Sequence, residues 1–172
     1  MQKLCQWPSP TQRAYLFGMQ ANSDLIRRFY GAFQRRDAAT MAACYHREIQ
    51  FSDPVFTDLR GPEVGRMWAM LCARGKDLRV DFSDVVAEGD TGGARWEADY
   101  TFSATRRPVH NQITAQFQFR DGLIVRHVDS FSFWRWSRQA LGPVGSLLGW
   151  TPHLQAKVQR TAAASLAAWH AG

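Results

Sequence analysis

The hexapeptide FSDPVF at residues 51–56 is the most informative stretch of the sequence. It marks the end of a predicted strand and places a carboxyl group there. Ile49, Phe51 and Asp53 alternate with polar residues, which predicts a half-buried strand that stops at Pro54. Asp53 therefore falls on the apolar face. A carboxyl group in such a place tends to have a raised pKa, as a general acid or base at neutral pH requires. The alternative is an aspartate that only caps the turn before Pro54.

Length and composition indicate one globular domain with a sizeable core. The 172 residues are 45% hydrophobic and 13% aromatic, which argues against disorder over most of the chain. Of the three cysteines, Cys5, Cys44 and Cys72, the last two fall on predicted apolar helix faces. Buried thiols in a reducing compartment fit this usage, so we expect a cytoplasmic protein. Residues 1–20 hold no continuous apolar run of signal length, so we expect neither a signal peptide nor a membrane span.

The net charge of +6 is compatible with a nucleic-acid partner, but the arrangement of the arginines argues against one. They come as scattered pairs at 27–28, 35–36 and 106–107, without a basic helix or an RNA-binding signature. A solvated surface is the better interpretation, and we expect no nucleic-acid partner. The five histidines are also scattered, so we expect no metal site and no cofactor.

The order of the patterns predicts an α+β domain, with helices first and a β-meander afterwards. Turn, cap and periodicity signals mark the elements. The expected helices begin at 22–24, at Asp37 (reaching Tyr45) and at Gly61-Pro62 (ending at Gly75), and the expected strands lie near 48–53, 78–82, 95–102, 111–119 and 123–136.

The last hairpin, at the Arg-Asp-Gly turn of residues 120–122, decides which face the final strand buries. A two-residue turn would bury Arg126, whereas a three-residue loop would turn Arg126 outward. We therefore expect the three-residue loop. It makes His127 and Asp129 point inward, with His127 near Ala115.

His127 and Asp129 form the second candidate for acid–base chemistry. On one strand face they lie about 7 Å apart, so His127 could act as the acid or base while Asp129 or Asp53 orients it. The alternative is a buried pair whose members satisfy only each other and the backbone. Other inward residues could contact a substrate, and these are Asn111, Tyr100, Trp68, Trp96 and Phe117.

The outward residues of the same strands are polar, and they suit a homodimer formed through the outer sheet face; plain solvent exposure is the alternative. The tail, 137–172, contains an apolar, glycine-rich stretch and then a helix that starts at Thr151-Pro152. We expect this helix to cover the domain, with a lid or a dimer element as alternatives. A membrane-surface helix ranks third, because its polar face holds only Lys157 and Arg160 as cations.

Taken together, the pattern resembles the nuclear transport factor two-like superfamily. That cone fold includes ketosteroid isomerase, scytalone dehydratase, limonene epoxide hydrolase and the SnoaL-like polyketide cyclases. The resemblance covers about residues 22–136 and is strongest at 25–33, 51–61, 120–124 and 127–131. It implies a cone-shaped α+β barrel of helices packed in a curved antiparallel sheet. Residues 1–21 would then form an N-terminal arm, and 137–172 a C-terminal helical extension.

The resemblance also carries implications for single residues. Asp53 matches the catalytic base of ketosteroid isomerase, but Phe29 and Ala115 stand where that enzyme has its oxyanion donors. Steroid isomerisation by that mechanism is therefore not expected. The resemblance implies a small, largely apolar molecule in the cone, acted on by an isomerase, cyclase or dehydratase. The alternative is a non-catalytic ligand-binding or dimeric protein-interaction module.

Overall fold

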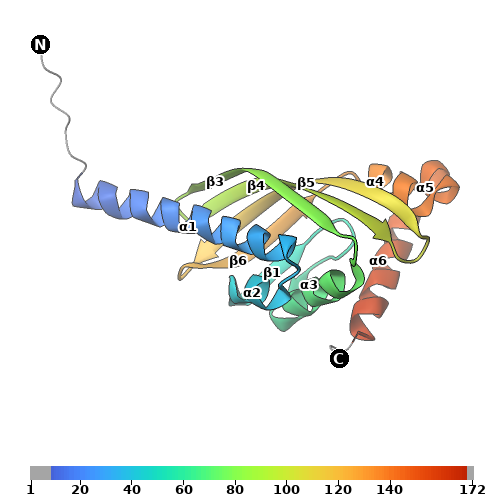
Figure 1. Ribbon diagram of the computed structural model, residues 1–172, viewed down its shortest axis with the longest axis horizontal. Coiled ribbons are helices and arrows are strands. Elements are labelled where there is room, and N and C mark those ends of the chain that lie inside the picture. The colour runs from blue at the N-terminus through green and yellow to red at the C-terminus, as the bar shows by residue number, and fades with distance from the viewer. Residues whose placement is uncertain (1–8, 170–172) are drawn as a thin grey trace, which may run out of the picture.

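The computed structural model describes residues 9–169, which form a curved sheet wrapped around helices (Figure 1). The helices are α1 (Pro10–Gln34), α2 (Ala38–Ala43), α3 (Pro62–Arg74), α4 (Phe133–Leu141), α5 (Pro143–Leu148) and α6 (Pro152–Ala167). The strands are β1 (Tyr45–Ser52), β2 (Leu59–Arg60), β3 (Arg79–Glu88), β4 (Thr91–Phe102), β5 (Arg107–Arg120) and β6 (Leu123–Ser130). This confirms the expected cone-shaped α+β class.

The sheet has six strands in the order β2-β1-β6-β5-β4-β3. Strands β3 to β6 form the expected antiparallel meander, but β1 pairs with β6 in parallel, so the sheet is mixed. A parallel pair needs a long crossover, and α3 with the meander supplies it. This pairing brings the end of β1, and with it Asp53, beside the inner face of β6.

The core lies between the concave sheet face and helices α1 and α3. From Pro108 onward, residues of β5 alternate strictly between exposed and buried, as period-two patterning predicts. The inner layer is rich in rings: Phe29 on α1 packs against Trp68 on α3, and Tyr30 on α1 packs against Phe117 on β5. On the outer face, His110 pairs with carboxylates of β4. Dimerisation through this face and a cytoplasmic location both stay predictions.

Helix α1 begins at Pro10, so the expected start at residues 22–24 is wrong. The side chains expected to cap the helix are engaged on its surface instead. Asn22 donates to the Gly89 carbonyl (2.9 Å), and Asp24 pairs with Arg27 (3.1 Å). Residues 10–21, expected in a loose arm, continue the helix and extend beyond the sheet (Figure 1).

The β5–β6 hairpin has a two-residue turn, so the expected three-residue loop is wrong. Asp121 and Gly122 have φ angles of 54° and 71°, as this turn requires. An irregularity farther along the ladder then shifts the register, and His127 pairs with Phe117 rather than lying opposite Ala115. Because side chains alternate with period two, a shift by two positions leaves His127 on the inner face.

Strand β6 ends at Ser130, and the expected continuation to residue 136 is wrong. Ser132 caps α4 by accepting a hydrogen bond from the Arg135 amide (3.3 Å). Phe133 and Trp136 then fall three residues apart on one helix face and are buried against Val109. The apolar residues at 131–136 fit the period of a strand as well as that of a helix. Burial of Phe133 and Trp136 on one face favours the helix.

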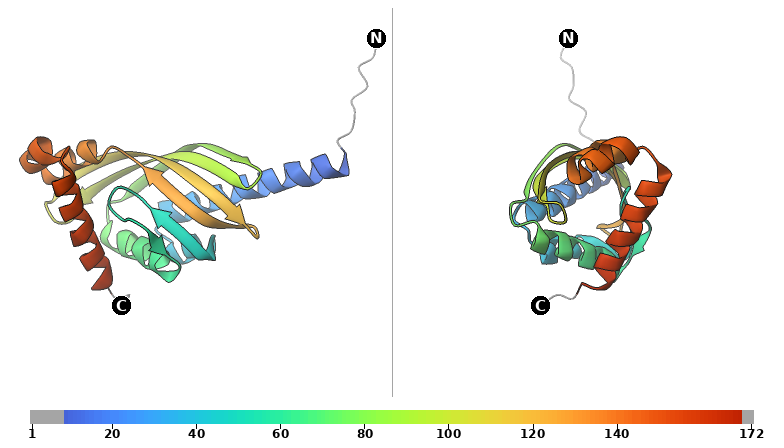
Figure 2. Two further views of the ribbon diagram at one scale, coloured as in Figure 1. Left: turned by 180° about the vertical axis from the view of Figure 1, so that it is seen from behind. Right: turned by 90° about the vertical axis from the view of Figure 1, so that its right-hand side faces the viewer.

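Helix α6 begins after Thr151 as expected and lies across the end of the cone (Figure 2). Leu154 and Leu166, near its two ends, are buried. Gln155 and Gln159 both donate to the Pro54 carbonyl, each at 3.1 Å, so α6 is attached beside Asp53. Within residues 9–169, no helix combines the length and apolar character needed to cross a bilayer.

Replacing Leu166 tests whether α6 is packed as described. Leu166→Ala should lower the free energy of unfolding by about 2–3 kcal/mol, because it removes buried methyl groups and leaves a cavity. Leu147→Ala is the matched control: Leu147 is 72% exposed and should change stability by less than about 0.5 kcal/mol. Urea denaturation measures both, and equal losses would contradict the packing of α6.

Candidate active site

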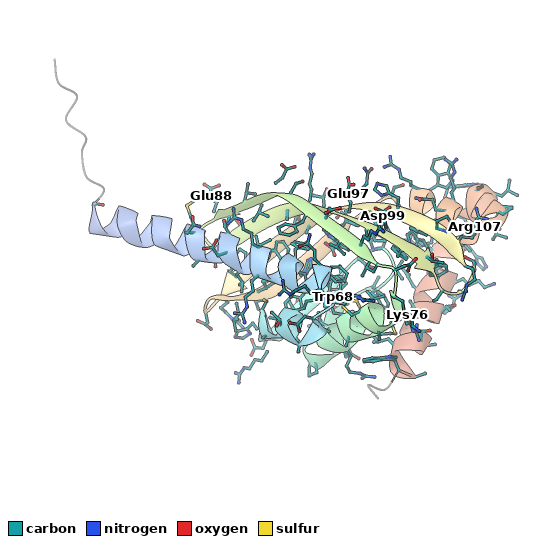
Figure 3. All side chains as sticks on the ribbon, viewed as in Figure 1. Trp68, Lys76, Glu88, Glu97, Asp99 and Arg107 are labelled. Carbon is teal, nitrogen blue, oxygen red and sulfur yellow. The ribbon has the colours of Figure 1, made fainter. Side chains whose placement is uncertain are left out.

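A cavity of about 620 Å³ lies between α3, α6 and the inner face of β4 and β5. Its size is in the range of small-molecule sites, about 300–1,000 Å³. The wall is mainly apolar, and Figure 3 shows Trp68 reaching from α3 toward the sheet. The polar side chains that interrupt this wall include Asp53, Tyr100, Asn111 and Asp129.

Asp53 closes a tight turn and also lines the cavity. Its Oδ1 accepts hydrogen bonds from the amides of Val55 (2.6 Å) and Phe56 (2.5 Å), while its own amide donates to the Phe56 carbonyl (2.8 Å). The capping role considered as the alternative is therefore real. Within the described residues Oδ2 makes no hydrogen bond, so it is the oxygen available to a ligand.

Burial raises the pKa of Asp53 to about 7. Loss of water is the largest cause, since it penalises the charged carboxylate. The two turn amides act in the opposite direction, and the nearby charge of Asp129 adds to the rise. Asp53 thus exchanges a proton in the neutral range, as acid–base catalysis requires.

A chain of buried hydrogen bonds runs behind the cavity wall. The Trp68 indole donates to the Tyr45 hydroxyl (2.9 Å), which lies 2.8 Å from His127 Nδ1. His127 Nε2 lies 3.1 Å from Asp129 Oδ1, and that oxygen also accepts from the Trp96 indole (3.1 Å). The chain therefore connects α3, β1, β6 and β4.

One tautomer of His127 gives every member of this chain a hydrogen-bond partner. A tryptophan indole can only donate, so the Tyr45 oxygen accepts from Trp68 and its own proton is free for His127 Nδ1. Nδ1 is then the acceptor, and Nε2 carries the proton that His127 donates to Asp129. In this arrangement His127 positions Asp129 by donating to its Oδ1.

The predicted site residues divide into two groups. Those that line the cavity are Asp53, Asn111, Asp129, Tyr100, Trp68 and Trp96. His127 and Phe117 are not part of the lining, because His127 is fully buried among the rings of Phe29, Phe51 and Phe117. The prediction that His127 points inward is confirmed, but its ring lies behind the residues that line the cavity.

Two hydrogen-bond donors face the cavity near the carboxyl groups. Tyr100 accepts from the Trp136 indole (2.9 Å) and keeps its own proton to donate. Burial, together with the charge of Asp53, raises the pKa of Tyr100 to about 12, so it stays protonated. Asn111 is 7% exposed, and its side chain makes no hydrogen bond with the described residues. Both side chains can therefore bind an oxygen of a ligand.

Tyr45 is the residue that the sequence analysis missed. We expected it at the end of the second helix, but it opens β1 and is buried. Tyr45 lies an even number of residues before Ile49 and Phe51, so the period-two pattern of the strand places all three on the same face. The exposed Arg47, which falls on that face, interrupts the pattern and hid the start of the strand. Within the described residues, no three His, Cys, Asp or Glu side chains gather in a way that could hold a metal ion.

Two tyrosines allow a matched test of the buried chain. Tyr45→Phe leaves the Trp68 indole and His127 Nδ1 without partners, and should lower the free energy of unfolding by about 1–3 kcal/mol. Tyr30→Phe is the control, because the equally buried Tyr30 hydroxyl has no hydrogen-bond partner in the described structure. Its loss should be neutral or stabilising. Thermal and urea denaturation compare the two, and a larger loss for Tyr30→Phe would refute the chain.

Comparison with known proteins agrees with this architecture. The family model described as SnoaL-like domain matches residues 26–127, more than half of the chain. A search of the curated proteins finds no sequence match.

Solved structures share the fold at low sequence identity. An M. tuberculosis LEH-like epoxide hydrolase has a TM-score of 0.62 at 17% identity, over 76% of this chain and 96% of its own. A candidate polyketide cyclase from Silicibacter sp. TM1040 has a TM-score of 0.60 at 21% identity, over 70% and 96% of the two chains. TerC, crystallised with polyporic acid, has a TM-score of 0.55 at 17% identity, over 64% and 91%.

Proposed function

Since this chain belongs to the SnoaL-like domain family of the nuclear transport factor two-like superfamily, we propose that it binds a small, largely apolar molecule in the cone. We propose further that it acts on this molecule by cofactor-free acid–base chemistry, as an isomerase, cyclase or dehydratase. One observation carries the proposal. Asp53 lines a mainly apolar cavity with one oxygen available, and burial raises its pKa to about 7.

Asp53 is the general base in this proposal. Its Oδ2 takes a proton from a carbon next to a carbonyl group, and the electron pair of that C–H bond moves toward the carbonyl oxygen. The developing oxyanion accepts hydrogen bonds from Tyr100 and Asn111, which take the place of the donors that Phe29 and Ala115 cannot supply. Return of the proton to a different carbon completes an isomerisation.

Asp129 has a supporting role. Trp96 and His127 hold its Oδ1, and its charge favours the protonated form of Asp53. It also places a second carboxylate on the cavity wall, which disfavours ligands that carry a negative charge near Asp53. A neutral carbonyl, enone or epoxide compound fits this wall best.

A ligand-binding module without chemistry is the second candidate. It is favoured by the turn at residues 53–56, where Asp53 Oδ1 already has two amide partners. It is also favoured by the enclosure of His127 behind the wall, which leaves Asp53 and Asp129 as the carboxyl groups that reach the cavity. A variant that removes the base but keeps the shape distinguishes the candidates.

Asp53→Asn should abolish turnover while keeping ligand affinity within about tenfold. For the wild type, turnover should rise with pH and reach half its maximum near 7, where Asp53 loses its proton. The assay incubates wild type and variant with a panel of cyclic ketones, enones and epoxides and follows products by mass spectrometry. If the wild type binds several compounds but converts none, the binding module becomes the better account.

The pH dependence of the free energy of unfolding should reveal the raised pKa of Asp53 without any substrate. The folded chain holds the Asp53 proton up to about pH 7, whereas the unfolded chain loses it near about pH 4. Wild-type stability should therefore fall across this window as pH rises, and Asp53→Asn should lack that component. Asp81→Asn, at an exposed position of β3, is the control. Urea titrations at several pH values give the comparison; parallel profiles for wild type and Asp53→Asn would rule out a raised pKa.

A further inference from the structure

Large apolar side chains gather on the outside of the α4–α5 hairpin. Among the described residues, the exposed large hydrophobic side chains are Val86 on β3 and five others, all within residues 134–150. These five are Trp134 (44% exposed), Val144 (53%), Leu147 (72%), Leu148 (49%) and Trp150 (74%), and together they form the apolar knob. The knob lies at the end of the molecule opposite the start of α1 (Figure 1).

The backbone packing of α5 forces these side chains outward. A Cβ atom on Gly145 would lie 1.8 Å from the Ser137 carbonyl oxygen, and one on Gly149 would lie 2.1 Å from Ser137 Oγ. The two glycines, one helical turn apart, therefore form the face of α5 that touches α4. Leu147 and Leu148, which lie between these glycines, cannot face α4 as well. Packing of the hairpin thus keeps these two leucines of the knob exposed.

The chain segment that carries the knob has charged side chains of one sign only. After Asp129 the sequence contains no Asp or Glu, but it contains Arg135, Arg138, Lys157 and Arg160. The Arg138 guanidinium lies over the Trp134 ring, 4.6 Å from its centroid. Arg107 donates to the Gln139 carbonyl of α4 (2.7 Å), and Figure 3 shows it at this end of the molecule.

We propose that the knob docks the protein on the surface of an anionic phospholipid bilayer. Tryptophan, leucine and valine side chains would enter the boundary between headgroups and acyl chains, and the arginines would lie near the phosphates. A second copy of the chain fits less well, because a symmetric contact would bring Arg138 against the same cationic patch of its partner.

The knob is also continuous with the cavity. Val144 belongs to the knob and, with Leu141, lines the cavity wall. In a protein docked in this way, the cavity wall formed by Val144 and Leu141 would lie beside the apolar layer of the membrane, in which small apolar molecules dissolve. The docking proposal does not rest on acid–base chemistry at Asp53, because it concerns a different set of side chains.

Vesicle binding by the full chain tests the proposal. The probes are vesicles of phosphatidylcholine alone and of phosphatidylcholine mixed with phosphatidylglycerol, and co-sedimentation measures binding. Wild type should bind the mixed vesicles more tightly, and salt should weaken that binding. Leu147→Asp should weaken it by at least about tenfold, since it places a charge in the inserted face. Arg138→Gln should weaken it about fivefold, as for one cation near an anionic surface.

Val86→Asp is the matched control, because it adds the same charge at an exposed valine of β3, away from the knob. It should bind the mixed vesicles nearly as wild type does, and circular dichroism should show that all variants are folded. Absence of wild-type binding to the mixed vesicles, or equal loss for Leu147→Asp and Val86→Asp, would overturn the proposal. So would a wild-type dimer, seen by analytical ultracentrifugation, that Leu147→Asp dissociates, since the knob would then be an interface between copies.

Discussion

The buried chain from Trp68 through Tyr45, His127 and Asp129 to Trp96 is the interaction on which the rest of the structure depends. An unpaired polar group at this depth would cost far more than a made hydrogen bond contributes, so each member requires the next. The chain therefore fixes where α3 sits over the sheet. It also holds the Asp129 carboxylate at the cavity wall, so the positions of helix and site are set together.

Patterning could predict the class of the fold and the faces of its strands, because period-two burial leaves a direct mark on the sequence. It could also predict the inward direction of His127, even though the expected loop was wrong, since the shorter turn and a one-residue bulge together shift the register by two. The depth of His127 could not be predicted. Depth depends on how rings from α1, α3, β1 and β5 fill space around it, and a single segment carries no trace of that packing.

The start of α1 and the presence of α5 were not predicted, for different reasons. At the N-terminal end, Asn22 and Asp24 are typical of a helix cap but make their contacts on the surface of α1. The first residue predicted for this helix was therefore wrong. At the C-terminal end, no helix was expected in the apolar, glycine-rich stretch, whereas two glycines of residues 142–149 allow α5 to approach α4 closely. Glycine marks both loops and tight helix contacts, and only the partner element distinguishes them.

The turn at Asp53 links ligand, proton and helix α6. Its amides stabilise the carboxylate while burial opposes it, and the balance leaves the pKa of Asp53 near 7. An apolar ligand that displaces water from Oδ2 removes hydration from the charged form and so must raise this pKa further. A ligand that donates a hydrogen bond to Oδ2 must lower it. Because Gln155 and Gln159 of α6 hold the Pro54 carbonyl of the same turn, the closure of the cavity and the acidity of Asp53 are properties of one segment.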